Sequence, residues 1–372
     1  MPTLGDVTAL LDQWYPPRTA DDWDAVGLVC GDPGADVQRI LLAVDPVTSV
    51  ADEAVEGGAQ LLVTHHPLFL KGVHGVAATD PKGRVVHRLL AAGCGLFAAH
   101  TNADAPTGGV SESLALALGV VDPRPLEPKR RELDKLVVFA PVEAAGRIRA
   151  ALVEAGAGTI GDYDSASFTS AGEGRFRPLR GARPAIGTIG EVETVDEVRI
   201  VVVAPRALRA HVVAQLRAAH PYEEPALDVI ELAAEEDPTS GSGRIGRLAE
   251  AVTLREFAER VTAALPETAH GVRVSGDPDQ RVETVALCGG AGDFLLDRAR
   301  AAGADVYLTS DLRHHPASEL REHGAPALVD VAHWAAESTW LPVLARRLTE
   351  ALGDTVEVSV STTNTDPWTF RV

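Results

Sequence analysis

The sequence predicts an α/β protein in which two related α/β halves form one split core, with an inserted ferredoxin-like α+β domain between them. Three observations carry this prediction. Short apolar runs alternate with helical stretches, as in a mostly parallel sheet. The two outer parts of the chain repeat the same strand endings, and the middle holds two consecutive strand–helix–strand units.

The N-terminal part is expected to open with an amphipathic helix that two prolines end. The apolar face of this helix is formed by Val7, Leu10, Leu11 and Trp14. Strands are predicted at residues 37–45, 61–64 and 96–100, with helices around 50–56 and 85–92 between them. Such alternation is typical of parallel strands joined by helices.

The middle of the chain repeats itself. The apolar stretches 135–141 and 199–205 both end in Ala-Pro, and each precedes a helical stretch, at 144–155 and 208–219. Each helix leads towards a further strand-like stretch, near residues 167–170 and 226–232. This pattern predicts the ferredoxin-like module.

Two segments that flank this module have the composition of linkers. Residues 122–132 contain three prolines and a basic cluster, and residues 234–246 are acidic and then rich in Ser, Gly and Thr. The predicted domains are therefore an N-terminal half at 1–125, an inserted domain at 133–233 and a C-terminal half at 245–372.

The outer halves mirror each other. Residues 58–64 resemble residues 303–309, and residues 94–100 resemble residues 327–333, where both strands end in histidine. Internal repetition of this kind predicts two structurally related halves.

Composition excludes several classes of function. The 372 residues carry a formal net charge of −19, which disfavours binding to nucleic acid or to an anionic membrane surface. No apolar run is long enough to span a bilayer, and the first residues do not show the basic-then-apolar pattern of a secretory signal. The three cysteines lie far apart and are expected to be buried thiols. We expect a cytoplasmic protein.

Histidines and carboxylates follow the predicted strand ends, where ligands bind in α/β sheets. One strand ends in His65 and His66, and another ends in His100 with Asp104 four positions later. In the C-terminal half the matching strand ends in His333, with Glu337 four positions later. Residues four apart share one face of a helix, so folding the halves together would gather these side chains.

Imidazole and carboxylate ligands together favour Zn, Fe, Mn or Co, and two carboxylates among four histidines can bridge two ions. Adjacent histidines can instead be structural or surface groups, and a lone His-x-x-x-Glu can be an intrahelical contact. Recurrence of the pair in both halves favours a centre with two divalent metal ions of unknown identity. Such ions would generate a hydroxide nucleophile.

Other residues are weaker candidates. The Gly289–Gly292 stretch could cradle a phosphate or simply form a glycine turn. Asp311, with His314 and His315, could line the same cavity or begin a solvated helix. For Asp24 and Asp45, roles in a turn and at a strand end are favoured over a role in the site.

Several motifs resemble the GTP cyclohydrolase 1 type 2 homologue family, also called dinuclear-metal-centre hexameric or NGG-interacting-factor-three-like proteins. The motifs that carry this resemblance are Asp22–Leu28, Thr64–Leu68, His100–Asp104 and Asp330–Glu337. In the insertion, Gly174–Pro178, Pro184–Gly187 and His220–Pro225 resemble the domain of long members that is like the signal protein PII.

The resemblance implies metal ligands at His65, His66, Asp104, His333 and Glu337, one carboxylate bridging, and a toroidal homohexamer. The family name implies hydrolytic opening of the guanine imidazole ring of GTP with loss of formate. We therefore expect a hydrolase acting on a nucleotide or related heterocycle, with His100 or His315 as a catalytic proton shuttle. The alternative is a non-catalytic regulatory or scaffold hexamer whose insertion senses a small effector.

Overall fold

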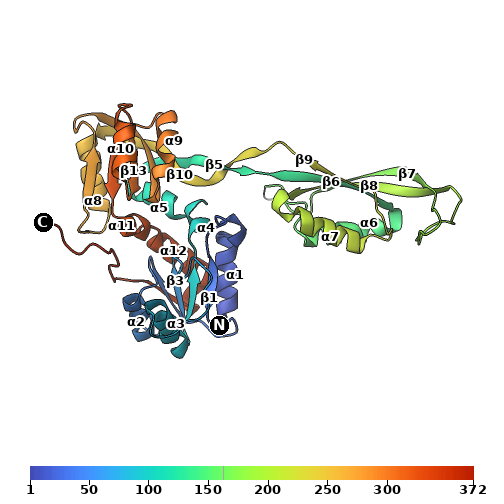
Figure 1. The fold of residues 1–372 in the computed structure, drawn as a ribbon, viewed down its shortest axis with the longest axis horizontal. Coiled ribbons are helices and arrows are strands. Elements are labelled where there is room, and N and C mark those ends of the chain that lie inside the picture. Colours follow the sequence, from blue (N-terminus) through green and yellow to red (C-terminus); the bar gives the residue numbers. More distant parts are fainter. Residues whose placement is uncertain (162) are drawn as a thin grey trace. The chain divides into compact units, whose positions relative to one another are not determined.

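The computed structural model describes residues 1–161 and 163–372, shown as a ribbon in Figure 1. It divides into two compact units. Unit 1 contains Met1–Lys129 and Pro238–Val372, and unit 2 contains Arg130–Asp237. The α/β fold class predicted from the sequence is confirmed.

The first sheet of unit 1 has the strand order β1-β4-β3-β2-β15. Its strands are β1 (Gly27–Cys30), β2 (Arg39–Ala43), β3 (Leu61–Thr64), β4 (Gly95–Ala98) and β15 (Glu357–Val360). Neighbouring strands from β4 to β15 run parallel, and only the edge strand β1 pairs antiparallel, with β4. Strands β3 and β4 are buried along their whole length, which explains their continuous apolar runs.

The second sheet of unit 1 has the order β11-β14-β13-β12-β10-β5. Its strands are β5 (Val120–Arg131), β10 (Glu235–Thr253), β11 (Val272–Ser275), β12 (Arg281–Ala291), β13 (Val306–Ser310) and β14 (Ala327–Val331). Strands β12, β13 and β14 run parallel, whereas β11 pairs antiparallel with β14. The order β11-β14-β13-β12 therefore repeats β1-β4-β3-β2, down to the antiparallel edge strand. The internal repeat is real.

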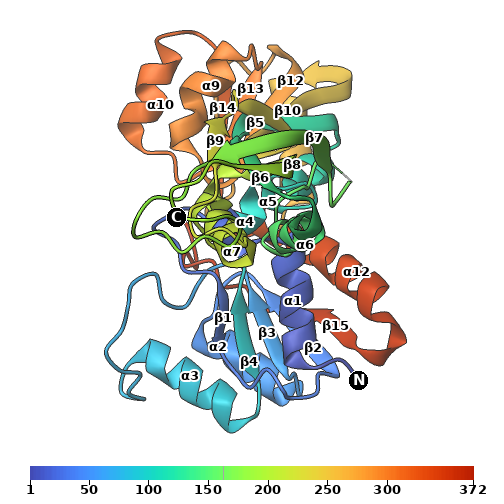
Figure 2. The same ribbon diagram turned by 90° about the vertical axis from the view of Figure 1, so that its right-hand side faces the viewer.

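Helices cover both sheets of unit 1 (Figure 2). They are α1 (Leu4–Trp14), α2 (Thr48–Glu56), α3 (Pro81–Ala91), α4 (Thr101–Asp104), α5 (Val110–Ala117), α8 (Leu254–Ala264), α9 (Leu296–Ala301), α10 (His314–Arg321), α11 (His333–Ser338) and α12 (Trp340–Leu352). The N-terminal helix α1 begins at a capping box, in which Thr3 and Asp6 each accept from the other's backbone N–H. It buries Leu4, Val7 and Leu11 against the first sheet, as the apolar spacing predicts.

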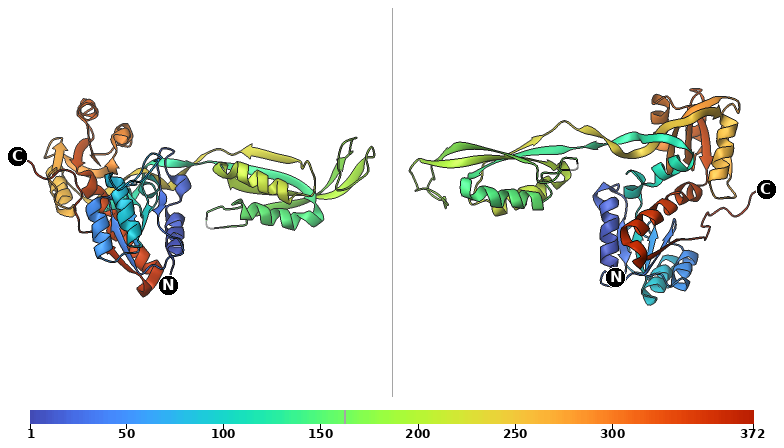
Figure 3. Two further views of the ribbon diagram at one scale, coloured as in Figure 1. Left: turned by 60° about the horizontal axis from the view of Figure 1, so that its bottom comes forward. Right: turned by 180° about the vertical axis from the view of Figure 1, so that it is seen from behind.

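The two halves exchange elements. Helix α12 comes from the C-terminal part of the chain, yet Trp340 and Leu344 pack in the core of the first sheet with Ile40 and Phe97. Helix α5 comes from the N-terminal part, yet Leu114 packs in the core of the second sheet. Figure 3 shows the red α12 among the blue strands. This exchange makes one continuous unit of the two halves.

Unit 2 has the order strand, helix, strand, strand, helix, strand. These elements are β6 (Leu133–Pro141), α6 (Ala145–Glu154), β7 (Ser167–Phe176), β8 (Glu193–Pro205), α7 (Arg209–Ala219) and β9 (Leu227–Glu231). The strands form an antiparallel sheet in the order β7-β8-β6-β9. Both helices pack on the same core as Leu136, Ile200 and Val202. This is the ferredoxin-like arrangement.

The two segments that the composition predicts as linkers are instead strands. Residues 122–131 belong to β5, and residues 235–246 belong to β10. Strand β5 lies at the edge of its sheet, where prolines are tolerated because no further strand needs their missing N–H groups. Local composition does not reveal this pairing, since the two strands are more than one hundred residues apart in the sequence.

Among the described residues, no helix combines the length and the apolar character that crossing a membrane requires.

Candidate metal centre

The five predicted metal-ligand residues come from three places in unit 1. His65 and His66 follow the end of β3, and Asp104 ends the short helix α4 that follows β4. His333 and Glu337 lie one turn apart on α11, which follows β14. Because these strands run parallel within each half, their carboxyl ends place these residues at matching edges of the two sheets.

Glu337 lies at the centre of the group. Its Oε1 is 2.7 Å from His333 Nε2 and 3.4 Å from His65 Nε2, and its Oε2 is 3.1 Å from His66 Nε2. His65 Nε2 is also 3.6 Å from Asp104 Oδ1. The structure therefore brings all five residues together. Two ligand atoms bound tetrahedrally to one zinc-sized ion stand about 3.3–3.5 Å apart, so this spacing suits shared coordination.

Three atoms of this group are buried and make no hydrogen bond of regular geometry with a described residue: His65 Nε2, Asp104 Oδ1 and Glu337 Oε2, the last of which has His66 Nε2 as a neighbour at 3.1 Å. Buried polar atoms are nearly always paired, so each such atom calls for an explanation. All three are of the N and O types that bind divalent transition metals. His65 is completely buried and Glu337 is 2% exposed, so water does not readily satisfy them. The donor set fits metal binding.

Outer groups fix the orientation of each imidazole through Nδ1. His65 Nδ1 contacts the carbonyl oxygen of Ala99 at 2.9 Å, and His66 Nδ1 contacts Asp45 Oδ1 at 2.7 Å. His333 Nδ1 contacts Asp311 Oδ2, also at 2.7 Å. When Nδ1 carries the proton, Nε2 keeps its lone pair and faces the group. This arrangement is typical of metal-binding histidines.

The contact between His66 and Asp45 overturns one interpretation of the sequence. A strand-end role was favoured for Asp45, but its carboxylate orients an imidazole of the group. Asp24 is a second case, because its Oδ1 lies 2.9 Å from His100 Nδ1 and its Oδ2 accepts from Thr101. Asp311, for which the sequence suggests either a cavity-lining role or the start of a solvated helix, is a third. Asp45 and Asp311 each come shortly after a strand, whereas Asp24 lies within the Asp22–Leu28 motif.

The group is strongly coupled electrostatically. Burial acts to raise the pKa of Glu337, but the imidazoles of His65, His66 and His333 lower it well below its ordinary value. Burial acts to lower the pKa of the histidines, but the neighbouring carboxylates raise it by more. They raise the pKa of His66 to about 11 and that of His333 to about 10. Without a metal, these imidazoles therefore hold protons that an ion would displace.

His100 belongs to the same cluster. Its ring lies 5.1 Å from that of His65 and 5.5 Å from that of His66, and ring nitrogens of the three lie within 4.8 Å of one another. A second group with the same limit contains His66, His333 and Glu337. His66 therefore belongs to both groups.

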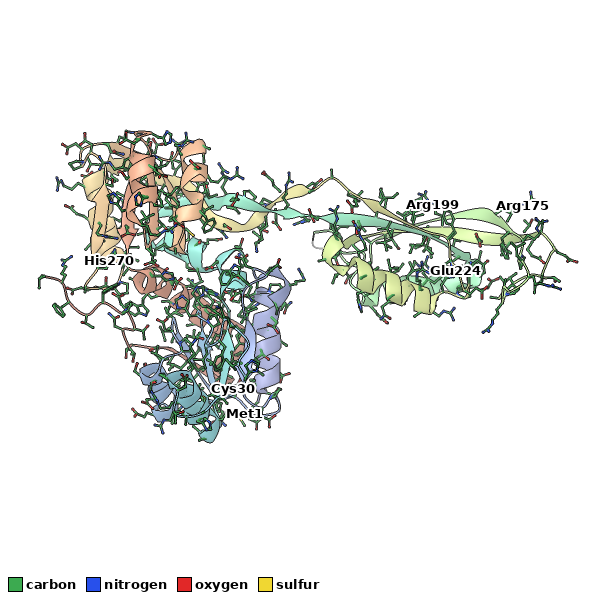
Figure 4. The ribbon with its side chains drawn as sticks, in the orientation of Figure 1. Met1, Cys30, Arg175, Arg199, Glu224 and His270 are labelled. Atoms are coloured by element: carbon green, nitrogen blue, oxygen red, sulfur yellow. The ribbon has the colours of Figure 1, made fainter. Side chains whose placement is uncertain are left out.

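His315 is not brought to this cluster. It lies in the first turn of α10, where its ring packs against that of His314 at 5.4 Å between centroids. It is not among the residues that line the cavity at the centre. His270, labelled in Figure 4, is largely buried, and its Nε2 lies 2.9 Å from Asp330 Oδ2.

Gly290, within the Gly289–Gly292 stretch, has a role that neither interpretation of the sequence includes. Gly290 has a φ of +76°, and a Cβ atom there would stand 2.6 Å from Glu337 Oε1 and 3.2 Å from His333 Nε2. Only glycine leaves room for these two side chains while accepting this backbone conformation. The end of β12 therefore forms a wall against which the centre packs.

A cavity of about 490 Å³ opens beside the centre and is lined by His100, Asp104, His333 and Glu337. Trp23 and Phe294 also line it and are 58% and 61% exposed. The Trp23 ring meets that of His100 edge-on at 5.8 Å between centroids. Lys129 lines the same cavity and donates to the carbonyl oxygen of Thr19. The cavity thus combines aromatic surface, a cation and the His and carboxylate group.

Two repeated α/β halves with histidines and carboxylates gathered at their strand ends define a class of proteins with groups that could bind a metal. Within this class, the chain belongs to the Duf34/NIF3 (NGG1p interacting factor 3) family, whose model matches residues 2–367. The family prediction made from the sequence motifs is confirmed.

Relatives match nearly the whole chain. The GTP cyclohydrolase 1 type 2 homolog of Mycobacterium tuberculosis is 51% identical over 367 residues, which cover 98% of this chain and 96% of that protein. The protein with the same name in Bacillus subtilis is 38% identical over 369 residues, covering 98% and 97%. The crystal structure of a Bacillus cereus protein related to NIF3 matches with a TM-score of 0.78 and 35% identity, covering 100% of this chain and 99% of that one.

Proposed function

We propose that this protein binds two divalent metal ions at the centre and hydrolyses a nucleotide or a related heterocycle. The proposed ligands are His65, His66, Asp104, His333 and Glu337. Glu337 would be the carboxylate shared by the two ions, because its two oxygens face different histidines. The observation that carries the proposal is the set of buried ligand atoms on His65, Asp104 and Glu337 that make no regular hydrogen bond.

Bound divalent ions supply water activation near neutral pH and polarise a substrate oxygen or nitrogen. Proton transfer and substrate binding would be carried out by residues of the chain. His100 lies at the cavity wall and is held by Asp24, so it is placed to accept and return a proton. The proposed proton shuttle is therefore His100, since His315 lies outside the cavity lining.

The cavity supports a ring-bearing anionic substrate. Trp23 and Phe294 offer exposed aromatic surface to a heterocycle, and Lys129 offers a positive charge to a phosphate in an otherwise acidic protein. The relatives carry the name of a GTP cyclohydrolase homologue, and GTP is accordingly the first substrate to test. A toroidal homohexamer is part of the same proposal and is tested by light scattering in solution.

The test combines metal analysis with turnover. Protein purified without added metal should contain about two divalent ions per chain, and Glu337→Gln should contain fewer than one. Formate release from GTP and hydrolysis of a phosphoester panel should both be assayed with the two proteins. Glu322→Gln, an exposed glutamate directly after α10, is the matched control. Fewer than one ion per wild-type chain, or unchanged turnover in Glu337→Gln, would contradict the proposal.

A second candidate function is regulation by a metal-containing scaffold without turnover. One observation favours it: unit 2 has a cavity of its own, described below, that needs nothing from the metal centre. A metal-loaded protein that turns over none of the substrates above, yet binds a small molecule in unit 2, would support this alternative.

A further inference from the structure

Unit 2 contains a cavity of about 280 Å³ that is separate from the metal centre. Its walls come from three stretches of sequence, 174–178, 182–186 and 222–226, together with Phe139 and Glu197 from the sheet. These stretches coincide closely with the motifs that the sequence singles out in the insertion and that the metal centre does not use. Because all three motifs line one cavity, they are candidates for a shared role in binding a ligand.

Glu197 forms the polar part of this cavity. It lies on β8 next to Val198, and Phe139 lies on β6 next to Ala140. Val198 and Ala140 belong to the core under the helices, so Glu197 and Phe139 point to the opposite face of the sheet. Glu197 is only 9% exposed, although a carboxylate is costly to bury without partners.

One partner of Glu197 is Tyr222, whose hydroxyl donates to Oε1 at 2.9 Å. Burial and this carboxylate raise the pKa of Tyr222, so the hydroxyl keeps its proton and remains a donor. Gly174 packs against the other oxygen, since a Cβ atom there would stand 2.2 Å from Oε2. The carboxylate is thus fixed in place, while its oxygens have lone pairs for further donors.

The rest of the cavity offers rings and positive charge. The Phe176 and Tyr222 rings meet edge-on at 5.7 Å between centroids, and Pro178 and Ile186 add apolar surface. Arg175 and Arg177 also line the cavity and are exposed. Neither guanidinium makes an ion pair with any residue that the structure describes. Figure 4 labels Arg175 on β7 and Glu224 on the segment after α7, two of the walls.

We propose that this cavity is a binding site for a guanine mononucleotide or a ligand of the same chemistry. The N1–H and amino group of guanine form two adjacent donors, which match the two oxygens of Glu197. The base would lie against the aromatic side chains, and the phosphate would face Arg175 and Arg177, which bind phosphate through paired N–H groups. Adenine offers one donor and one acceptor on the same edge, and it matches a carboxylate less well.

The experiment is binding of GMP to the full-length protein by titration calorimetry. Glu197→Gln, which keeps the shape of the side chain, should weaken GMP binding at least tenfold, because one acceptor oxygen becomes an NH2 group that cannot accept from guanine. The double variant Arg175→Ala/Arg177→Ala should weaken GMP binding to a similar degree. Its affinity for guanosine, which has no phosphate, should be nearly unchanged. AMP should bind at least tenfold more weakly than GMP. Glu154→Gln, an exposed glutamate on α6 outside the cavity, is the matched control.

The experiment must distinguish GMP binding in unit 2 from GMP binding at the metal centre. GMP binding should therefore persist with the same affinity in metal-stripped protein and in Glu337→Gln. Loss of binding in either would assign the nucleotide to the metal centre and overturn the inference. Absence of GMP binding, equal binding of AMP, inorganic phosphate competing as well as GMP, or no effect of Glu197→Gln would each overturn it as well. None of these results bears on turnover at the metal centre.

Discussion

Arg244 Nη2 donates a hydrogen bond of 2.8 Å to the carbonyl oxygen of Ala105, the residue that follows the candidate ligand Asp104. The same nitrogen donates to Pro106, and Nη1 donates to the carbonyl oxygens of Gly241 and Gly243. Arg244 is 1% exposed, so its guanidinium is a buried clamp. It ties β10 to the chain segment that carries Asp104.

Replacing this clamp should cost both stability and metal affinity. In Arg244→Gln, several buried carbonyl oxygens lose their donors, and we expect the free energy of unfolding to fall by about 2–4 kcal/mol. Metal should also bind more weakly, because Asp104 loses its support. Urea unfolding and metal titration measure the two effects. Arg247→Gln, which removes an exposed guanidinium that pairs with Glu283, should change stability by less than about 0.5–1 kcal/mol. An Arg244→Gln protein as stable as this control would refute the prediction.

Gly290→Ala should damage the centre directly. Its Cβ atom would meet Glu337 Oε1 at 2.6 Å, so the carboxylate would have to move. We expect at least a tenfold loss of metal affinity, measured by competition with a chelator. Gly303→Ala is a close control, because Gly303 has a similar φ of +72° but a Cβ atom there meets nothing within 4 Å. It separates backbone strain from the steric effect. Equal affinity in the two variants would show that Gly290 does not shape the centre.

Asp311→Asn should weaken metal binding without unfolding the protein. Asp311 accepts from His333 and has a φ of +57°, a conformation that asparagine also adopts. An amide orients the imidazole less well than a carboxylate, and changes of this kind typically cost 10- to 100-fold in affinity. The melting temperature of the metal-free protein should stay near that of wild type. Asp297→Asn, an exposed residue paired only with Arg300 in the described structure, should bind metal normally. Wild-type affinity in Asp311→Asn would count against this role.

Metal binding should release protons. The pKa of His66 is raised to about 11 and that of His333 to about 10, so both imidazoles are protonated at pH 7 when no metal is present. A metal ion needs the neutral form, and affinity should therefore rise as the pH increases from 6 to 8. Calorimetry in buffers of different ionisation enthalpy should detect more than one proton released per chain. Binding heats that are independent of the buffer would contradict this expectation.

Much of the fold could be predicted because the apolar runs are strong. Strand β3 spans residues 61–64, as the run Leu-Leu-Val-Thr predicts, and α7 differs from its prediction by one residue. Strand β5 could not be predicted, because prolines and charged residues at this density are typical of a loop. Its pairing with β10 depends on a segment far away in the sequence, and local composition carries no information about such a partner.

Part of the metal centre could also be predicted, because a clear sequence pattern marks it. Histidine followed by a carboxylate four positions later recurs at matching strand ends, so His333 and Glu337 could be matched to His100 and Asp104. The orienting contacts of Asp24 and Asp45 could not, because they depend on where loops bring side chains from elsewhere in the sequence. Gly290 was missed because its role lies in the space left free by a missing side chain.

The exchange of α5 and α12 between the halves has a consequence for synthesis on the ribosome. The first sheet needs Trp340 and Leu344 to cover its apolar surface, and β15 extends it beside β2. Those residues are translated more than two hundred residues after β4. The N-terminal half therefore leaves the ribosome with an uncovered face, whereas unit 2 has its whole core within Leu136–Leu227. The middle of this chain can fold before its beginning does.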